Sequence, residues 1–375
     1  MCAVLAMAVT GKPSQAAVWG VSPRASVAVR YDSNLQLRAD DENDSVGGSA
    51  TAGAHIVRYG DTVDWKFDPQ LLLVRYRDDT DLNRTESQID AAVERRLELS
   101  QWTATASYVR DTTLTSELGS SGITQVNLPH EHIVVALSPA LQLNERCSAG
   151  LQGSWSNDRY LGAGASGLVD YDYGVGFLQL ACQATQRSDL AVDASYARLT
   201  ASSVRYETEQ LAANLRWDVS LSERWKLSLA GGPLRVRSSI AIDNGIGYSV
   251  ELSGRAETSR LNLSWSQDTS PNGRGALSKR DRVVLSAGRQ FGARLSADLT
   301  GQWLHNEDAV QQIGLSIESI RYVYADTTLR WLVSPTVSSF VSIGWSRQAQ
   351  QTTAIAGHGY HVAVGMAWQA LERGH

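Results

Sequence analysis

The sequence predicts an all-β fold, a single transmembrane antiparallel up-and-down β-barrel of about 18 strands, with about 16 as the alternative count. Three observations predict it. Apolar and polar residues alternate in many segments, the connectors between these segments are alternately long and short, and aromatic residues gather near both ends of the segments. Together they favour a barrel over a soluble sandwich or a propeller.

Composition supports a sheet-rich fold and excludes several classes of protein. The 375 residues include 31 Gly, 11 Trp and 13 Tyr but only 4 Phe and 3 Met, which is typical of strands joined by many turns. The formal net charge of -5 provides no basic surface for phosphates, so nucleic acid is not an expected partner. After the N-terminus no apolar run approaches the roughly 20 residues of a membrane helix, which excludes a helical membrane protein.

The N-terminal residues resemble a secretory signal. A short apolar stretch from Ala3 to Val9 is followed by Ser14-Gln15-Ala16, a small-x-small pattern suited to a signal peptidase. We expect a signal peptide over residues 1–16 and the barrel over residues 17–375. The usual basic n-region is missing, which leaves two alternatives, a start further upstream or a mature N-terminal tail.

A period of two is clearest in residues 294–306, RLSADLTGQWLHN. Leu295, Leu299 and Trp303 fall on one face of this segment, and Asp298 and Thr300 fall on the other, as in a strand between two different environments. The same alternation occurs in ASVAVRYDSN at 25–34, QWTATASYVR at 101–110, QLAANLRWDVS at 210–220, YSVELSGRAE at 248–257 and GYHVAVGMAWQ at 359–369. The apolar faces are rich in Ala, Val and Gly, whereas a soluble core would contain more bulky side chains.

The connectors predict two different rims. Short turns are expected at YGDT from 59, SLSERW from 220, AETS from 256, FGAR from 291 and VSPT from 333. Long connectors rich in Asp, Asn, Gly and Ser are expected near 38–46, 77–84, 111–129, 157–170, 237–245, 269–281 and 349–357. Short periplasmic turns and long extracellular loops are typical of outer-membrane barrels.

Aromatic residues form two groups along the predicted strands. Indole and phenol rings favour the bilayer interface, so two belts are expected in a membrane barrel. The belt near the short turns comprises Trp65, Trp102, Trp217, Trp225, Trp331 and Trp368. The belt near the long loops comprises Tyr31, Tyr108, Trp155, Tyr196, Trp265, Trp303 and Trp345.

If the apolar faces meet lipid, the opposite faces line the lumen. The charged residues expected there are Arg30, Asp32, Lys66, Asp68, Asp90, Glu94, Asp193, Arg216, Asp218, Lys226, Glu251, Arg255, Asp298, Asp326 and Arg330. They allow two interpretations, a ladder of mutually neutralising charges or a polar conduit whose charges select solutes. Tyr322, Tyr324 and Phe340 share this face and would either contact sugar rings or fill space. The connector 111–129 is the best candidate for a loop that constricts the lumen.

No catalytic, cofactor or metal site is predicted. His130 and His132 are two residues apart and share one face of a strand, but the sequence shows no third ligand. The acidic run ADDENDS at 39–45 lacks the spacing of a calcium loop and is interpreted as a solvated loop. The sequence has no G-x-S-x-G elbow, phosphate loop or dinucleotide fingerprint, so the chain is not expected to be an enzyme.

Cys147 and Cys182 are predicted to form a disulfide. Each lies near the short-turn end of one of two consecutive strands, on the apolar face, where directly opposed side chains come close together. The periplasm is oxidising, which favours the bond. The alternative is two separate buried thiols, because a register slip of one residue would place the side chains on opposite faces.

Two stretches carry a resemblance to a known group of proteins. VAVRYDSN at 27–34 and SQDTSPNGRGALSKRDRVVLSAGRQFGARLSADLTGQW at 266–303 resemble outer-membrane β-barrels that accompany exopolysaccharide and protein-sorting (PEP-CTERM) gene clusters in Gram-negative bacteria. Trp368 is followed by QALERGH, which departs from the usual terminal aromatic residue.

These observations lead to two hypotheses about function. The first is a porin-like channel of the Gram-negative outer membrane for saccharide passage or exopolysaccharide export. The second is a structural or partner-docking barrel with a plugged lumen and no transport. Expected partners are outer-membrane lipid and lipopolysaccharide, the barrel-assembly machinery, and polysaccharide or small solutes.

Overall fold

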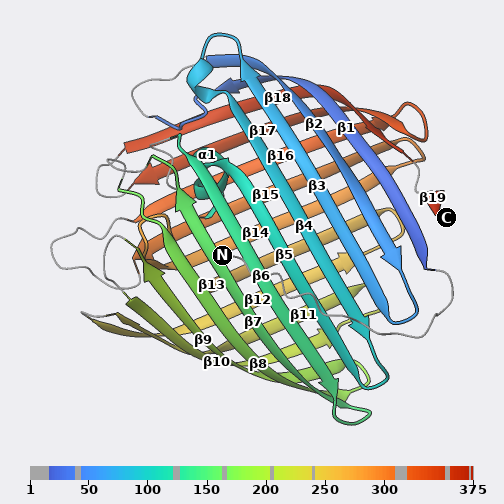
Figure 1. Ribbon diagram of the computed structural model, residues 1–375, viewed down its shortest axis with the longest axis vertical. Helices are drawn as coiled ribbons and strands as arrows, with labels where there is room; N and C mark the ends of the chain where they lie inside the picture. The colour runs from blue at the N-terminus through green and yellow to red at the C-terminus, as the bar shows by residue number, and fades with distance from the viewer. Residues whose placement is uncertain are drawn as a thin grey trace.

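The computed structural model describes residues 17–38, 44–120, 127–162, 167–202, 207–238, 241–308, 319–350, 355–370 and 373–374. Within these ranges, 18 long strands form one closed antiparallel barrel (Figure 1), because each strand pairs with its sequence neighbours and β1 pairs with β18. The predicted fold class is confirmed, and the larger of the two predicted strand counts is correct. The predicted signal peptide and most of the acidic run, residues 39–43, lie outside the described residues.

The strands run up and down in chain order. The first nine are β1 (Val18–Ser33), β2 (Asp44–Tyr59), β3 (Val63–Tyr76), β4 (Arg84–Arg96), β5 (Ser100–Thr112), β6 (Pro129–Gln142), β7 (Cys147–Tyr160), β8 (Tyr171–Thr185) and β9 (Ser188–Ala201). The next nine are β10 (Glu207–Ser220), β11 (Trp225–Ser238), β12 (Ile242–Arg255), β13 (Ser259–Pro271), β14 (Leu277–Phe291), β15 (Leu295–Asp308), β16 (Ile320–Leu332), β17 (Val337–Gln350) and β18 (Ile355–Gln369). A two-residue strand, β19 (Arg373–Gly374), pairs with the beginning of β1.

The outer surface of the barrel is apolar. On β1, Val27 and Val29 are 60% and 65% exposed, whereas Asp32 on the opposite face is 1% exposed. Belt residues such as Trp65 at one end and Trp155 at the other are also exposed. Closure pairs the backbone of every strand, so this surface can face hydrocarbon without an open sheet edge. This is the architecture of a barrel that spans a bilayer.

The two rims differ as the connectors predicted. Turns such as 60–62, 256–258 and 292–294 form the short rim. The other rim carries the 3-10 helix η1 (Thr80–Leu82), the helix α1 (Thr113–Ser120) and the connector between β7 and β8. Among the described residues, no helix is long and apolar enough to cross a bilayer.

The strands are longer at the loop rim than the sequence predicted. A long connector was expected at 269–281, but β13 continues to Pro271 and β14 begins at Leu277. Backbone hydrogen bonds continue the ladder whatever the polarity of the side chains, so pairing extends past the apolar part of a strand. β9 and β15 also end at this rim, and β10 and β16 begin there; no long connector was predicted from the sequence at these two places.

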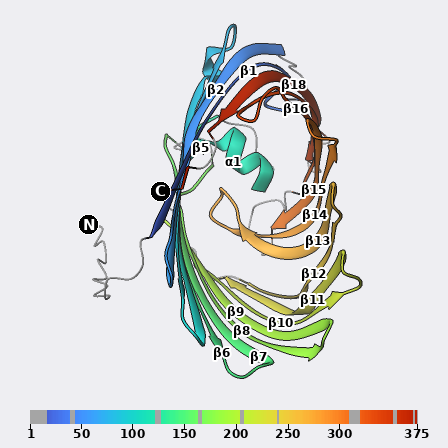
Figure 2. The ribbon, with the colours of Figure 1, turned by 90° about the vertical axis from the view of Figure 1, so that its right-hand side faces the viewer.

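The outer half of the barrel interior, toward the loop rim, is packed. Figure 2 shows α1 inside the ring of strands. Three buried apolar clusters lie at this end, formed around Leu199 and Leu277, around Val74 and Leu114, and around Leu304. The core of the molecule is therefore inside the barrel and close to the long-loop rim.

Candidate solute path

The predicted lumen charges lie on inward strand positions. Arg216, for example, lies between Leu215 and Trp217, whose side chains are 59% and 42% exposed on the outer surface. The same alternation places Asp298 and Asp326 on the inner side of neighbouring strands.

Most of these inward charges have polar partners. In the outer half, the Arg30 guanidinium donates two hydrogen bonds to Asp32, at 2.6 and 2.8 Å, and the Tyr76 hydroxyl donates a third at 2.9 Å. Such ladders keep buried charges satisfied. The same kind of pairing joins Asp68 to His55, Glu94 to Arg96, Arg216 to Asp193 and Asp218, Asp298 to Arg260 and Asp326 to His361. Asp90 accepts hydrogen bonds from Ser107 and Gln88, and Glu251 accepts one from Asn262.

The remaining predicted lumen residues are four exposed cations, Lys66, Lys226, Arg255 and Arg330. They lie in the inner half of the barrel, toward the short turns. Lys226 and Glu251 line a hollow of about 370 Å³, and Arg255 and Asp298 line another of about 400 Å³. The inner half therefore presents accessible charges of both signs.

Sequence reasoning missed several inward cations, including Arg260, Arg280 and Arg282. Arg280 donates two hydrogen bonds to Asp268, and Arg260 donates one to Asp298. The stretch SKRDR at 278–282 is polar on both faces, so alternation gives no indication of which face is inward. Only pairing with β13 and β15 assigns it.

Two segments narrow the outer half of the interior. The first is α1, where Glu117 accepts a hydrogen bond from the Tyr160 hydroxyl of β7. The connector 111–129 was expected to constrict the lumen, and its helix does lie inside the ring (Figure 2).

The second narrowing segment is the link 272–276 between β13 and β14. The Val169 amide donates to the Gly273 carbonyl at 2.8 Å, which joins this link to the connector after β7. A Cβ at Gly273 would lie 2.7 Å from Leu168 and 3.1 Å from the Tyr160 hydroxyl, and Gly275 has a φ of +70°. Glycine permits both the turn and this close approach.

Between these segments lies a cavity of about 490 Å³. Its wall combines serine hydroxyls, tyrosine rings, carboxylates and two histidines, from Asp111, Glu117, His130, His132, Ser154, Ser156, Asp158, Tyr171, Tyr173 and Ser270 among others. The sequence suggested only the two histidines. Asp158 and Asp111 come from neighbouring strands, and no local pattern links them to the histidines.

The three aromatic residues predicted on the lumen face have different environments. Tyr322 is 5% exposed and packs with Leu37 and Leu304, so it fills space. Tyr324 is partly buried, and its ring stacks on His361 with centroids 6.3 Å apart. Phe340 is also partly buried.

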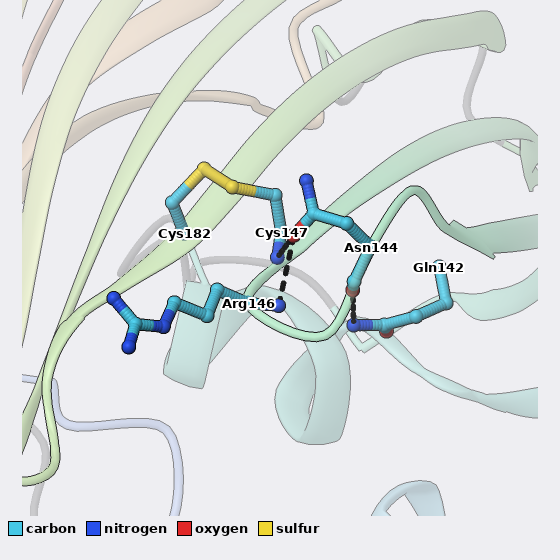
Figure 3. Close-up of a disulfide and its surroundings, with 5 residues drawn as sticks. All are labelled: Gln142, Asn144, Arg146, Cys147 and Cys182. Carbon is cyan, nitrogen blue, oxygen red and sulfur yellow. Dashed lines mark hydrogen bonds between the residues drawn. A yellow bond between two sulfur atoms is a disulfide. The ribbon is translucent and has the colours of Figure 1, made fainter.

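Cys147 and Cys182 are joined by a disulfide at the short-turn end of β7 and β8 (Figure 3). The two residues are direct partners in the strand register. Asn144 organises the preceding turn, because its side-chain oxygen accepts hydrogen bonds from the backbone amides of Arg146 and Cys147, both at 2.9 Å.

The fold and this interior define a bilayer-spanning β-barrel with a constricted outer end. No protein-family model matches the chain, and no curated protein sequence matches it. The solved structures similar to it include OpdL of Pseudomonas aeruginosa, with 12% identity, a TM-score of 0.44, and coverage of 95% of this chain and 99% of that one. OccK2 (OpdF) of the same organism, in complex with glucuronate, has 14% identity, a TM-score of 0.48, and coverage of 94% and 98%. The FrpB iron transporter from Neisseria meningitidis has 8% identity, a TM-score of 0.48, and coverage of 94% and 81%.

Proposed function

We propose that this chain is a channel of the Gram-negative outer membrane that admits small hydrophilic solutes. The observation that carries the proposal is the asymmetry of its interior. The outer half is narrowed around one cavity of about 490 Å³, and the inner half has accessible charges of both signs. A narrow entrance followed by a polar wall restricts passage to small, well-hydrated solutes.

Saccharides are the first solutes to test. The outer cavity offers the rings of Tyr171 and Tyr173 next to the hydroxyls of Ser154 and Ser156. Aromatic rings with polar groups beside them suit a sugar, which has an apolar ring face and hydroxyls at its edge. Exopolysaccharide export and the association with PEP-CTERM clusters stay predictions.

A second candidate function is a plugged barrel that docks a partner and transports nothing. The three apolar clusters in the outer half and the many internal ion pairs favour it. In that case α1 would be a permanent part of the core.

Conductance of the full-length protein in a planar bilayer separates the two candidates, with Tyr160→Phe as the test variant. Tyr160→Phe removes the hydrogen bond that holds Glu117 of α1. A hydrogen bond to a charged group is worth about 1.5 kcal/mol or more, so the population with α1 undocked would rise roughly tenfold. We expect step-like currents from the parent protein and larger or more frequent openings from Tyr160→Phe.

The matched control is Tyr196→Phe, which removes a similar hydrogen bond, from Tyr196 to Glu209, on the outer surface. Its conductance should equal that of the parent protein. Correctly folded parent and Tyr160→Phe proteins that both carry no current would reject the channel and leave the plugged barrel. Swelling of liposomes in mono- and disaccharides then tests the solute class.

A further inference from the structure

Three side chains at the outer ends of β6 and β7 bring metal-ligating atoms together. His130 and His132 lie on β6, and Asp158 on β7 is the register partner of His132. Asp158 Oδ1 lies 3.1 Å from His130 Nε2 and 2.8 Å from His132 Nδ1. One ligand atom from each residue lies within 4.8 Å of the others. We infer that this cluster binds a divalent transition-metal ion, with Zn²⁺ as the first ion to test.

The donor set suits such an ion. Two imidazoles and a carboxylate are ligands that Zn²⁺ accepts in open, three-residue sites. With bonds of about 2.0–2.2 Å, the ligand atoms of a tetrahedral site lie roughly 3.3 Å apart. The separations of 2.8 and 3.1 Å from Asp158 Oδ1 to the two imidazole nitrogens are close to this value. All three ligand atoms lie within 4.8 Å of one another, so side-chain shifts of up to about 1.5 Å would bring them to the spacing of a tetrahedral site.

Asp111 provides the outer support that a metal-bound histidine usually has. The other ring nitrogen of His130, Nδ1, lies 3.0 Å from Asp111 Oδ1, and both residues are buried. A histidine that ligates a metal through one nitrogen commonly donates the other N–H to a carboxylate. Asp111 would thus orient His130 with Nε2 toward the metal, as a positioning residue.

Asp158 supplies a second, independent observation. It is 4% exposed, and its Oδ2 atom has no hydrogen-bond partner among the described residues, although the Tyr171 phenol is nearby. A buried carboxylate oxygen without a partner is costly. A cation at the cluster would satisfy this oxygen as well as Oδ1.

The site has room for a further ligand. The His132 side chain is 32% exposed, and the cavity of about 490 Å³ beside it includes Ser154, Ser156 and Glu117. A water or a solute group would complete the coordination there. Metal binding requires no transport, so this inference stands independently of the channel proposal.

The experiment measures Zn²⁺ binding to the full-length folded protein by competition with a chromophoric chelator, with Co²⁺ absorption as a report on geometry. The variants are His132→Ala, Asp158→Asn and Asp111→Asn. The matched control is His55→Gln, because His55 is an inward histidine paired with a single carboxylate, Asp68, at 2.6 Å.

We expect one Zn²⁺ per chain. His132→Ala and Asp158→Asn should lower affinity by about 100-fold or more, and Asp111→Asn by roughly 10- to 100-fold, the usual cost of losing an outer partner. His55→Gln should bind as the parent does.

Lack of saturable Zn²⁺ binding, or parent-like binding by His132→Ala, would overturn the site. An equal loss in His55→Gln would show that binding is adventitious and would also overturn it. If Asp158→Asn fails to fold, judged by heat-modifiable mobility, His132→Ala decides the question, because its side chain is partly exposed and its removal is tolerated more easily.

Discussion

At the scale of single residues, neighbours in sequence have opposite environments. On β15, Leu299 is an exposed outer residue, and the next residue, Thr300, is paired with Asp326 on the inner face. One step along the strand thus changes the surroundings from hydrocarbon to a polar interior. The effect of a charge should change just as abruptly.

We predict that Leu299→Arg lowers the free energy of unfolding of the folded barrel by about 2–4 kcal/mol, the cost of an arginine near the bilayer midplane. Thr300→Arg should cost much less, because its guanidinium would lie near Asp326. Urea titration of both variants in lipid vesicles measures the difference. Equal losses would contradict the assignment of the two faces.

At the scale of elements, hairpins behave differently at the two rims. The register of β12 with β13 covers only Tyr248–Arg255 against 260–267, whereas the register of β13 with β14 continues to Pro271 and Leu277. The end of the β13–β14 hairpin is therefore not paired with β12. It packs against Leu168 and Tyr160 inside the barrel. At the short rim, the pairing of β7 with β8 continues to Cys147, the first residue of β7, which pairs with Cys182.

The disulfide between these two strands leads to a test at the same scale. We predict that thiol alkylation of unreduced, denatured protein leaves Cys147 and Cys182 unmodified, because the register places them directly opposite each other in an oxidising compartment. Intact mass reads out the number of alkylated cysteines. Modification of both in protein taken from a correctly folded barrel would refute the bond.

At the scale of the whole molecule, ring closure encloses a charged interior, and in the channel that we propose these charges would control ion passage. Asp298 pairs with Arg260, and Asp326 pairs with His361. The predicted lumen residues comprise nine acids and six bases. The further inward cations Arg260, Arg280 and Arg282 offset this excess, so the loss of two acids would leave the bases in the majority among these residues. A charged low-dielectric lumen concentrates ions of the opposite sign.

We predict that the double variant Asp298→Asn/Asp326→Asn weakens cation preference, because two negative charges are lost and Arg260 is released from its ion pair. Reversal potentials in a salt gradient measure this. Asp61→Asn, in the exposed turn 60–62, removes a charge outside the lumen and should leave the reversal potential unchanged. An unaltered potential in the double variant would show that these acids do not face the ion path.

Sequence alone determined the period of two, a strand count of about 18 with 16 as the alternative, the difference between the rims and the two aromatic belts. Each of these properties is local, because the strand period follows from backbone geometry and the belts follow from the bilayer interface. The residue type at a position such as Leu299 or Trp303 was sufficient to assign its face.

Only the tertiary structure decided what fills the interior. The contact of Glu117 with Tyr160, the inward fold of 272–276 and the meeting of Asp158 with His130 all join residues that are far apart in sequence. The inward cations at 280 and 282 were also unassigned, because the stretch SKRDR at 278–282 is polar on both faces. These features depend on which strands face each other across the lumen once the barrel is closed. The side-chain pattern of a single strand carries no information about the residues on the opposite strands.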